Sequence, residues 1–191
     1  MAPKKPGTFI IIWIMIALAG CAGTPGRGGD SQSPAAQSPI VPKAAPVITQ
    51  SFASPQIAPG WTWKVYLKAS DADGDMKDIA AVVHQPGIGD YPISFTRLGE
   101  KHRGEFSGYL FLVIPPYSSL DNVAMSVTVQ IRDRAGNSSQ PIKLPLFIGS
   151  LARLQPPPPG VFQENDLGPI MVNLRTVGDD DRPGHFDRFR R

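Results

Sequence analysis

The sequence predicts an all-β sandwich for residues 47–149, and three observations carry this prediction. Short runs of alternating apolar and polar residues recur along the stretch, separated by Gly, Pro, Asn and Asp. About seven such runs fit into roughly 100 residues, which is the strand density of a two-sheet sandwich. No part of the stretch keeps the apolar spacing of an amphipathic helix. Two sheets with one apolar face each would bury those faces against each other.

Two predicted strands, residues 61–70 and 123–132, alternate most clearly. The apolar face of the first holds Trp61, Trp63, Val65, Leu67 and Ala69. The apolar face of the second holds Val123, Met125, Val127, Val129 and Ile131. A period of two with one polar face predicts antiparallel strands, and it places both tryptophans in the core rather than in an exposed sugar-binding row. The other predicted strands are residues 47–52, 79–84, 91–98, 106–114 and 141–148.

Residues 106–114 are apolar on both faces from Tyr109 onward, so we expect this strand to be covered on both sides or to lie against another segment. After the sandwich, the prolines of residues 155–160 predict a stiff polyproline II spacer. The apolar alternation in residues 170–174 leaves room for one more short strand, whereas the polar end should be disordered. Residues 150–191 are therefore predicted to be a proline-rich hinge and a largely disordered extension.

The N-terminus has the order of a secretory signal peptide: a basic start, an apolar run from Phe9 to Leu18, and small residues before Cys21. A membrane-spanning helix needs about 20 consecutive apolar residues. This run is too short for a span because Gly20 interrupts it. Cys21 is the only cysteine in the chain, so an ordinary signal peptide would leave one free thiol on an exported protein.

The sequence Leu18-Ala19-Gly20-Cys21 resembles the lipobox of bacterial lipoproteins. The resemblance implies signal cleavage between Gly20 and Cys21. It also implies a thioether bond from Cys21 to diacylglycerol and a further acyl chain, such as palmitate, on the new amino terminus. Two or more acyl chains anchor a protein stably, so the protein is expected on a membrane of the cell envelope. Ala22 after the cysteine, in place of Asp, implies the outer membrane.

The expected chain has four parts: the signal peptide (1–20), the lipidated cysteine with a disordered linker (21–46), the sandwich (47–149) and the extension (150–191). The linker contains almost no large apolar side chain, so it cannot offset its ordering entropy and should be a flexible tether. The chain carries 19 basic and 16 acidic residues. Lys4 and Lys5 lie in the signal peptide, which leaves 17 basic residues against 16 acidic ones. This balance gives no support for a nucleic-acid partner.

The residues that follow two of the strands carry a second resemblance. They read Lys68-Ala-Ser-Asp71-Ala-Asp73-Gly-Asp75 and Val129-Gln-Ile-Arg-Asp133-Arg-Ala-Gly-Asn137. Both are similar to strand ends of bacterial immunoglobulin-like domains of the fibronectin type III, cadherin and PKD kind. The resemblance implies a seven-strand immunoglobulin-like sandwich. The Cys-Trp-Cys pattern of antibody domains is absent, because the predicted sandwich contains no cysteine.

The acidic loop with Asp71, Asp73 and Asp75 is the candidate metal site. In a seven-strand sandwich, the connections after the second and sixth strands lie at the same end, so Asp133 and Asn137 should approach this loop. Converging carboxylates are the hard oxygen ligands that calcium requires. The same residue types also form ordinary turns, and their spacing is not that of an EF-hand loop. Calcium binding and turn formation are therefore the two interpretations of these aspartates.

No catalytic motif is evident in the sequence. The three histidines, His84, His102 and His185, lack metal-ligand spacing, and no nucleophile elbow occurs. The expected function is a non-enzymatic binding or scaffolding module that presents loops or a sheet edge to an envelope protein or glycan, with no cofactor besides the calcium considered above. One alternative is an accessory subunit of a secretion, adhesion or surface electron-transfer assembly. Another is an enzyme, which a deep polar cleft holding His84 or His102 beside a carboxylate would favour.

Overall fold

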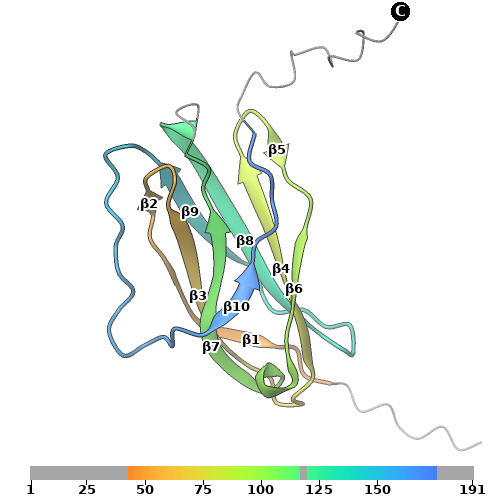
Figure 1. The fold of residues 1–191 in the computed structure, drawn as a ribbon. Coiled ribbons are helices and arrows are strands. Elements are labelled where there is room, and N and C mark those ends of the chain that lie inside the picture. The colour runs from red at the N-terminus through yellow and green to blue at the C-terminus, as the bar shows by residue number, and fades with distance from the viewer. Residues whose placement is uncertain (1–42, 117–119, 176–191) are drawn as a thin grey trace, which may run out of the picture. The chain divides into compact units, whose positions relative to one another are not determined.

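Residues 43–116 and 120–175 are described by a computed structural model, in which two β-sheets pack face to face (Figure 1). The four-stranded sheet has the order β1-β3-β7-β10. Its strands are β1 (Val47–Ala53), β3 (Thr62–Ser70), β7 (Glu105–Val113) and β10 (Asp166–Pro169). The six-stranded sheet has the order β2-β9-β8-β4-β5, and β6 also pairs with β4. Its strands are β2 (Gln56–Ile57), β9 (Ile142–Ile148), β8 (Val123–Asp133), β4 (Met76–Gln85), β5 (Gly89–Asp90) and β6 (Ser94–Arg97).

All seven predicted strands are present, and the fold is the predicted all-β immunoglobulin-like sandwich. The long neighbouring strands pair antiparallel: β1 with β3, β3 with β7, β4 with β8 and β8 with β9. A short 3-10 helix, η1 (Glu100–His102), precedes β7. In the described part of the chain, no helix has the length and apolar character that crossing a membrane requires.

The core lies between the two sheets and consists almost entirely of apolar side chains. The four-stranded sheet contributes Trp63, Val65, Leu67, Leu110 and Leu112, and the six-stranded sheet contributes Ile79, Val83, Val127, Val129 and Ile131. Trp63 is fully buried, and its Nε1 donates a hydrogen bond to the carbonyl oxygen of Ser54 at 2.7 Å. The only polar atom of this large side chain is therefore satisfied inside the core.

The prediction that Trp61 lies in the core is wrong. Its side chain is 55% exposed, because β3 begins only at Thr62. Trp61 belongs to the preceding turn, in which Gly60 adopts a φ of 84°. That left-handed backbone breaks the extended geometry, so the alternation of the strand does not reach back to Trp61.

The chain after β9 does not leave the sandwich as an extended, disordered tail. Residues 150–175 are named here the C-terminal strap. Its first part passes the outer side of β3, β10 then lies beside β7, and residues 169–175 contact β6 and the end of β4 (Figure 1). Gln155 N donates a hydrogen bond to Ser54 Oγ at 3.0 Å, and the Phe162 ring lies 5.6 Å from the Tyr66 ring. The folded part therefore extends beyond the predicted boundary at residue 149, while residues 176–191 lie outside the described residues.

The strap lies against the edge of β7, so that strand does lie against another segment, although its outward Val113 stays 59% exposed. Asn165 O accepts a hydrogen bond from Tyr109 N at 2.8 Å, and β10 then pairs with β7 in parallel. Farther along, Ile170 is only 4% exposed and joins the core, and Val172 and Leu174 pack against it. The predicted alternation in residues 170–174 is therefore used for packing, whereas the added strand lies just before it, at residues 166–169.

A polar cluster fastens the middle of the strap to β3. Glu164 accepts hydrogen bonds from Lys64 Nζ and from the Tyr66 hydroxyl, both at 2.7 Å. Burial, reinforced by the bond to Glu164, raises the pKa of Tyr66 to about 12. The hydrogen bond from Lys64 in turn lowers the pKa of Glu164. The Tyr66 phenol therefore stays protonated and able to donate at any ordinary pH.

Candidate functional site

Three of the four aspartates predicted as metal ligands meet at one end of the sandwich. Asp71 follows β3, Asp75 precedes β4, and Asp133 ends β8. Each offers a carboxylate oxygen, and these oxygens all lie within 4.8 Å of one another. The residues are 7%, 8% and 3% exposed, respectively. We name these three residues the acidic cluster.

Local turn chemistry explains only some of the carboxylate oxygens in the acidic cluster. Asp133 accepts hydrogen bonds from the Asn137 amide, at 2.7 Å, and from Asn137 Nδ2, at 2.8 Å. Asp71 Oδ1 accepts a bond from the Asp73 amide at 3.0 Å. The other oxygen of Asp71, Oδ2, and Asp75 Oδ1 are buried without any hydrogen-bond partner. Two acceptor atoms of the cluster are thus left unsatisfied.

A lysine from the predicted tether provides the positive charge next to the cluster. Lys43 Nζ lies 2.5 Å from Asp75 Oδ2. Its hydrogen bond lowers the pKa of Asp75, and the same contact raises the pKa of Lys43. Burial, helped by the nearby charge of Asp75, raises the pKa of Asp71. The surroundings therefore oppose the ionisation of Asp71 while they favour that of Asp75.

The structure separates Asp73 from the acidic cluster. Asp73 is exposed, and its Oδ2 accepts a hydrogen bond from the Ala44 amide at 2.6 Å. Lys43 was not predicted as a site residue, because it follows a long polar segment and its sequence neighbours carry no strand pattern. Asp78 also lies apart, since Arg132 donates to both of its carboxylate oxygens, at 2.7 and 2.9 Å.

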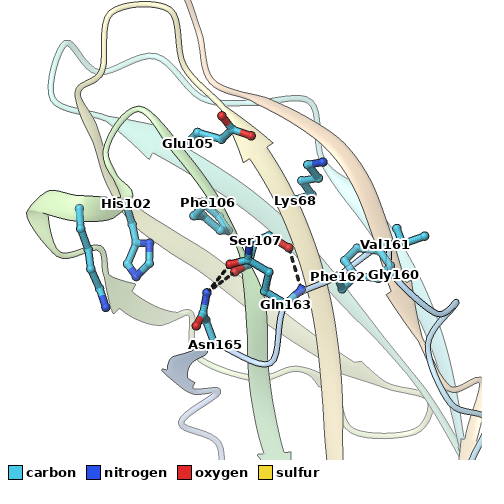
Figure 2. Close-up of a pocket in the computed structure, with 11 residues that line it drawn as sticks. Lys68, His102, Glu105, Phe106, Ser107, Gly160, Val161, Phe162, Gln163 and Asn165 are labelled. Atoms are coloured by element: carbon cyan, nitrogen blue, oxygen red, sulfur yellow. Dashed lines mark hydrogen bonds between the residues drawn. The ribbon is translucent and has the colours of Figure 1, made fainter.

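A second polar feature is an open pocket of about 530 Å³ between the strap and the start of β7. Figure 2 shows its polar side chains: Lys68 from β3, His102 from η1, Glu105 and Ser107 from β7, and Gln163 and Asn165 from the strap. Gln163 N donates to Ser107 Oγ at 3.0 Å, and Asn165 Nδ2 donates to Ser107 O at 3.0 Å. These bonds attach the strap to β7 and occupy the Ser107 hydroxyl.

His102 lines the open pocket together with Glu105, whereas His84 lies apart from it. The His102 ring meets the Phe106 ring edge-on at 6.2 Å, and burial lowers the pKa of His102. None of the hydrogen bonds and ion pairs among the described residues joins His102 to a carboxylate. His84 Nδ1 lies 2.7 Å from Asp90 Oδ1, but both side chains are exposed on the β4–β5 hairpin. Gly20, Cys21 and His185 lie outside the described residues.

No family model and no curated protein sequence matches the chain. Among solved structures, a Niemann-Pick type C2 protein from the Japanese carpenter ant has a TM-score of 0.38 at 10% identity, over 56% of this chain and 95% of that one. The fibronectin(III)-like modules of Clostridium thermocellum CbhA have a TM-score of 0.35 at 13% identity, over 57% of this chain and 50% of that one.

A third similar structure is the CARDB domain of a Pyrococcus furiosus protein in complex with di-metal ions. Its TM-score is 0.30 at 8% identity, over 55% of this chain and 85% of that one. At identities this low, the similarity concerns the fold alone.

Proposed function

We propose that this protein is a lipid-anchored component of a bacterial cell envelope whose immunoglobulin-like sandwich is a non-enzymatic binding or scaffolding module. The anchor is Cys21, which follows the lipobox sequence from Leu18 to Gly20. Lipid at this position would hold the folded residues near the outer membrane through the linker. The partner is an envelope protein or glycan.

The observation that supports a binding module is the difference between the two outer faces of the sandwich. The strap covers the outer face of the four-stranded sheet. In the described part of the chain, no comparable segment lies over the strands β6, β4, β8 and β9 of the other sheet, which we name the open face. Outward side chains on it include Phe95, Phe147 and Lys143, with Phe95 51% and Phe147 41% exposed.

The open face combines groups that suit recognition. Arg132 stacks on the Phe95 ring at 4.2 Å, and its guanidinium is fixed by the bidentate bond to Asp78. Exposed aromatic and arginine side chains are enriched in protein interfaces. A rigid sheet presents them with little loss of conformational entropy on binding.

The anchoring part of the proposal is tested by replacing Cys21 with serine. We expect wild-type protein in the membrane fraction, with a diacylglyceryl group on Cys21 in mass spectra of the N-terminal peptide. Cys21→Ser should move the protein to the soluble fraction or leave the leader uncleaved, because serine cannot form the thioether. A wild-type protein with an unmodified thiol at residue 21 would contradict lipid anchoring.

The binding part is tested by cross-linking in native membranes and affinity capture of the full-length protein. We expect the double variant Phe95→Gln/Lys143→Glu to capture its envelope partner at least about tenfold less than wild type, since truncating a central aromatic contact costs about 2 kcal/mol or more. Met171→Gln is the matched control, because Met171 is 71% exposed but lies on the strap. Equal capture by all three proteins would rule out the open face, and no specific capture by wild type would rule out the module.

A further inference from the structure

We propose that the acidic cluster of Asp71, Asp75 and Asp133 binds one divalent cation, calcium by its ligand chemistry, in competition with the ammonium of Lys43. The proposal does not depend on the lipid anchor or on the open face. It rests on the buried carboxylates and on the hydrogen-bond donors and positive charge that the surrounding chain provides to only some of their oxygens.

The first argument is the pair of unsatisfied oxygens. Asp71 Oδ2 and Asp75 Oδ1 have no hydrogen-bond partner, and their residues are more than nine-tenths buried. Buried polar atoms in native proteins are nearly always paired, and each exception calls for an explanation such as an ion. Turn formation explains Asp71 Oδ1 and both oxygens of Asp133, but it supplies no donor to Asp71 Oδ2 or Asp75 Oδ1.

The second argument is the balance of charge. Three carboxylates with ligand oxygens within 4.8 Å repel one another, and the ammonium of Lys43 is hydrogen-bonded to only one of them. A divalent cation placed among the three would offset more of this charge than one ammonium does, and it would give both unsatisfied oxygens a ligand partner.

The third argument is the fit to calcium. Calcium binds oxygen ligands at about 2.3 to 2.6 Å, so ligands on opposite sides of the ion lie about 4.6 to 5.2 Å apart. The oxygens of the cluster all lie within 4.8 Å of one another, which is close enough for them to share one ion. The cluster contains carboxylates without His or Cys, which favours calcium or magnesium over zinc and copper. Mono- and bidentate carboxylates with waters suit the flexible coordination of calcium better than the strict octahedron of magnesium.

The fourth argument is the way in which the chain before β1 approaches the cluster. Lys43 contacts Asp75, the Ala44 amide contacts Asp73, and Asn137 Nδ2 donates to Lys43 O at 3.2 Å. Lys43 therefore acts as a built-in monovalent cation that partly neutralises the cluster. Its side chain is half exposed, so it can leave when a divalent ion enters. Calcium binding would then break the contact between Lys43 and Asp75 that helps to hold the chain before β1 against the cluster.

The test is a calorimetric titration of the full-length protein, purified in detergent and stripped with EGTA, with calcium chloride at constant ionic strength. We expect saturable binding of one ion, with a Kd of about 10⁻⁴ to 10⁻³ M as in extracellular calcium modules, and a matching rise in melting temperature. Asp75→Asn and Asp133→Asn should each weaken binding at least about tenfold, whereas the exposed Asp73→Asn should weaken it less than about threefold.

Lys43→Gln distinguishes a calcium site from an acidic turn with a purely structural role, because only a site would gain calcium affinity when the lysine is removed. Removing the competing charge should tighten calcium binding about threefold to tenfold while it lowers the melting temperature of the calcium-free protein. Lys64→Gln is the matched control, since it breaks the ion pair with Glu164 and should leave the calcium affinity unchanged.

Two results would overturn the proposal. One is the absence of saturable binding to wild type and to Lys43→Gln up to about 10 mM calcium, tenfold above the weakest expected Kd. The other is a calcium affinity that Asp75→Asn and Asp133→Asn do not change. Far-UV circular dichroism identifies any variant that fails to fold, and Lys43→Gln, which alters no aspartate, then decides the question. An unchanged affinity in Lys43→Gln would overturn the competition.

Discussion

Replacing Trp63 with alanine is expected to destabilise the protein by about 4 kcal/mol, the middle of the range for buried aromatic side chains. Trp63 is fully buried near the start of β3, where it pairs with Leu112 of β7, so its removal leaves a cavity in the core. It also leaves the carbonyl oxygen of Ser54 without its donor. Because domains of this size are stable by only about 5 to 15 kcal/mol, the variant should be marginally folded.

The measurement is urea denaturation of the full-length protein, followed by far-UV circular dichroism. Trp61→Ala is the matched control and should change stability by less than about 0.5 kcal/mol, since Trp61 is more than half exposed. Trp63→Phe should fall between the two, because it keeps most of the ring volume and loses the hydrogen bond. Similar costs for Trp61→Ala and Trp63→Ala would contradict the burial of Trp63 and the exposure of Trp61.

A second large effect is expected at Gly108, where the strap crosses β7. A Cβ at this position would lie 2.5 Å from the backbone oxygen of Asn165 and 2.9 Å from Leu167 Cγ. The first contact is with backbone, which cannot move aside without displacing the strap. We expect Gly108→Ala to cost about 1 to 3 kcal/mol and to detach residues 161–170 while the rest of the sandwich stays folded.

Hydrogen exchange distinguishes detachment of the strap from global unfolding. The amides of Tyr109 and Ile170, which bond Asn165 O and Phe111 O, should lose protection in Gly108→Ala. The amides in β8, which pair with β4 and β9, should keep it. Gly104→Ala is the control, because a Cβ there would meet its nearest neighbour at an ordinary 3.9 Å. Unchanged protection at Tyr109 in the Gly108 variant would show that the strap tolerates the added methyl group.

The sequence predicted the strands of the sandwich well because most long strands, unlike β7, have one apolar face toward the core and one more polar face. That arrangement produces an alternation of apolar and polar residues in β3 and β8 that is visible in the sequence. It also predicted that Asp133 would approach the acidic loop, because the topology of a seven-strand sandwich places the two connections at the same end. Whether calcium binds there stays a prediction.

The features that the sequence did not reveal are those without a period. The strap binds through an extended, proline-containing segment whose hydrogen bonds go to other parts of the chain, so its order depends on side chains such as Phe162 and Glu164 finding β3. Lys43 is a single charge in a polar context, and its role comes only from the three-dimensional position of Asp75. The orientation of Trp61 was also not predictable from the alternation, because the left-handed backbone of Gly60 ends the extended geometry before β3 begins.

The position of β10 at the edge of the four-stranded sheet also affects the tendency of this protein to self-associate. Without β10, the four-stranded sheet would end at β7, a long strand whose free amide and carbonyl groups could template the addition of a foreign strand. The chain instead closes that edge with four residues of its own, and these include Gly168 at a φ of 134° and Pro169, which has no amide to donate. A border so short and irregular discourages further growth of the sheet, so the strap protects the molecule against self-association through this side.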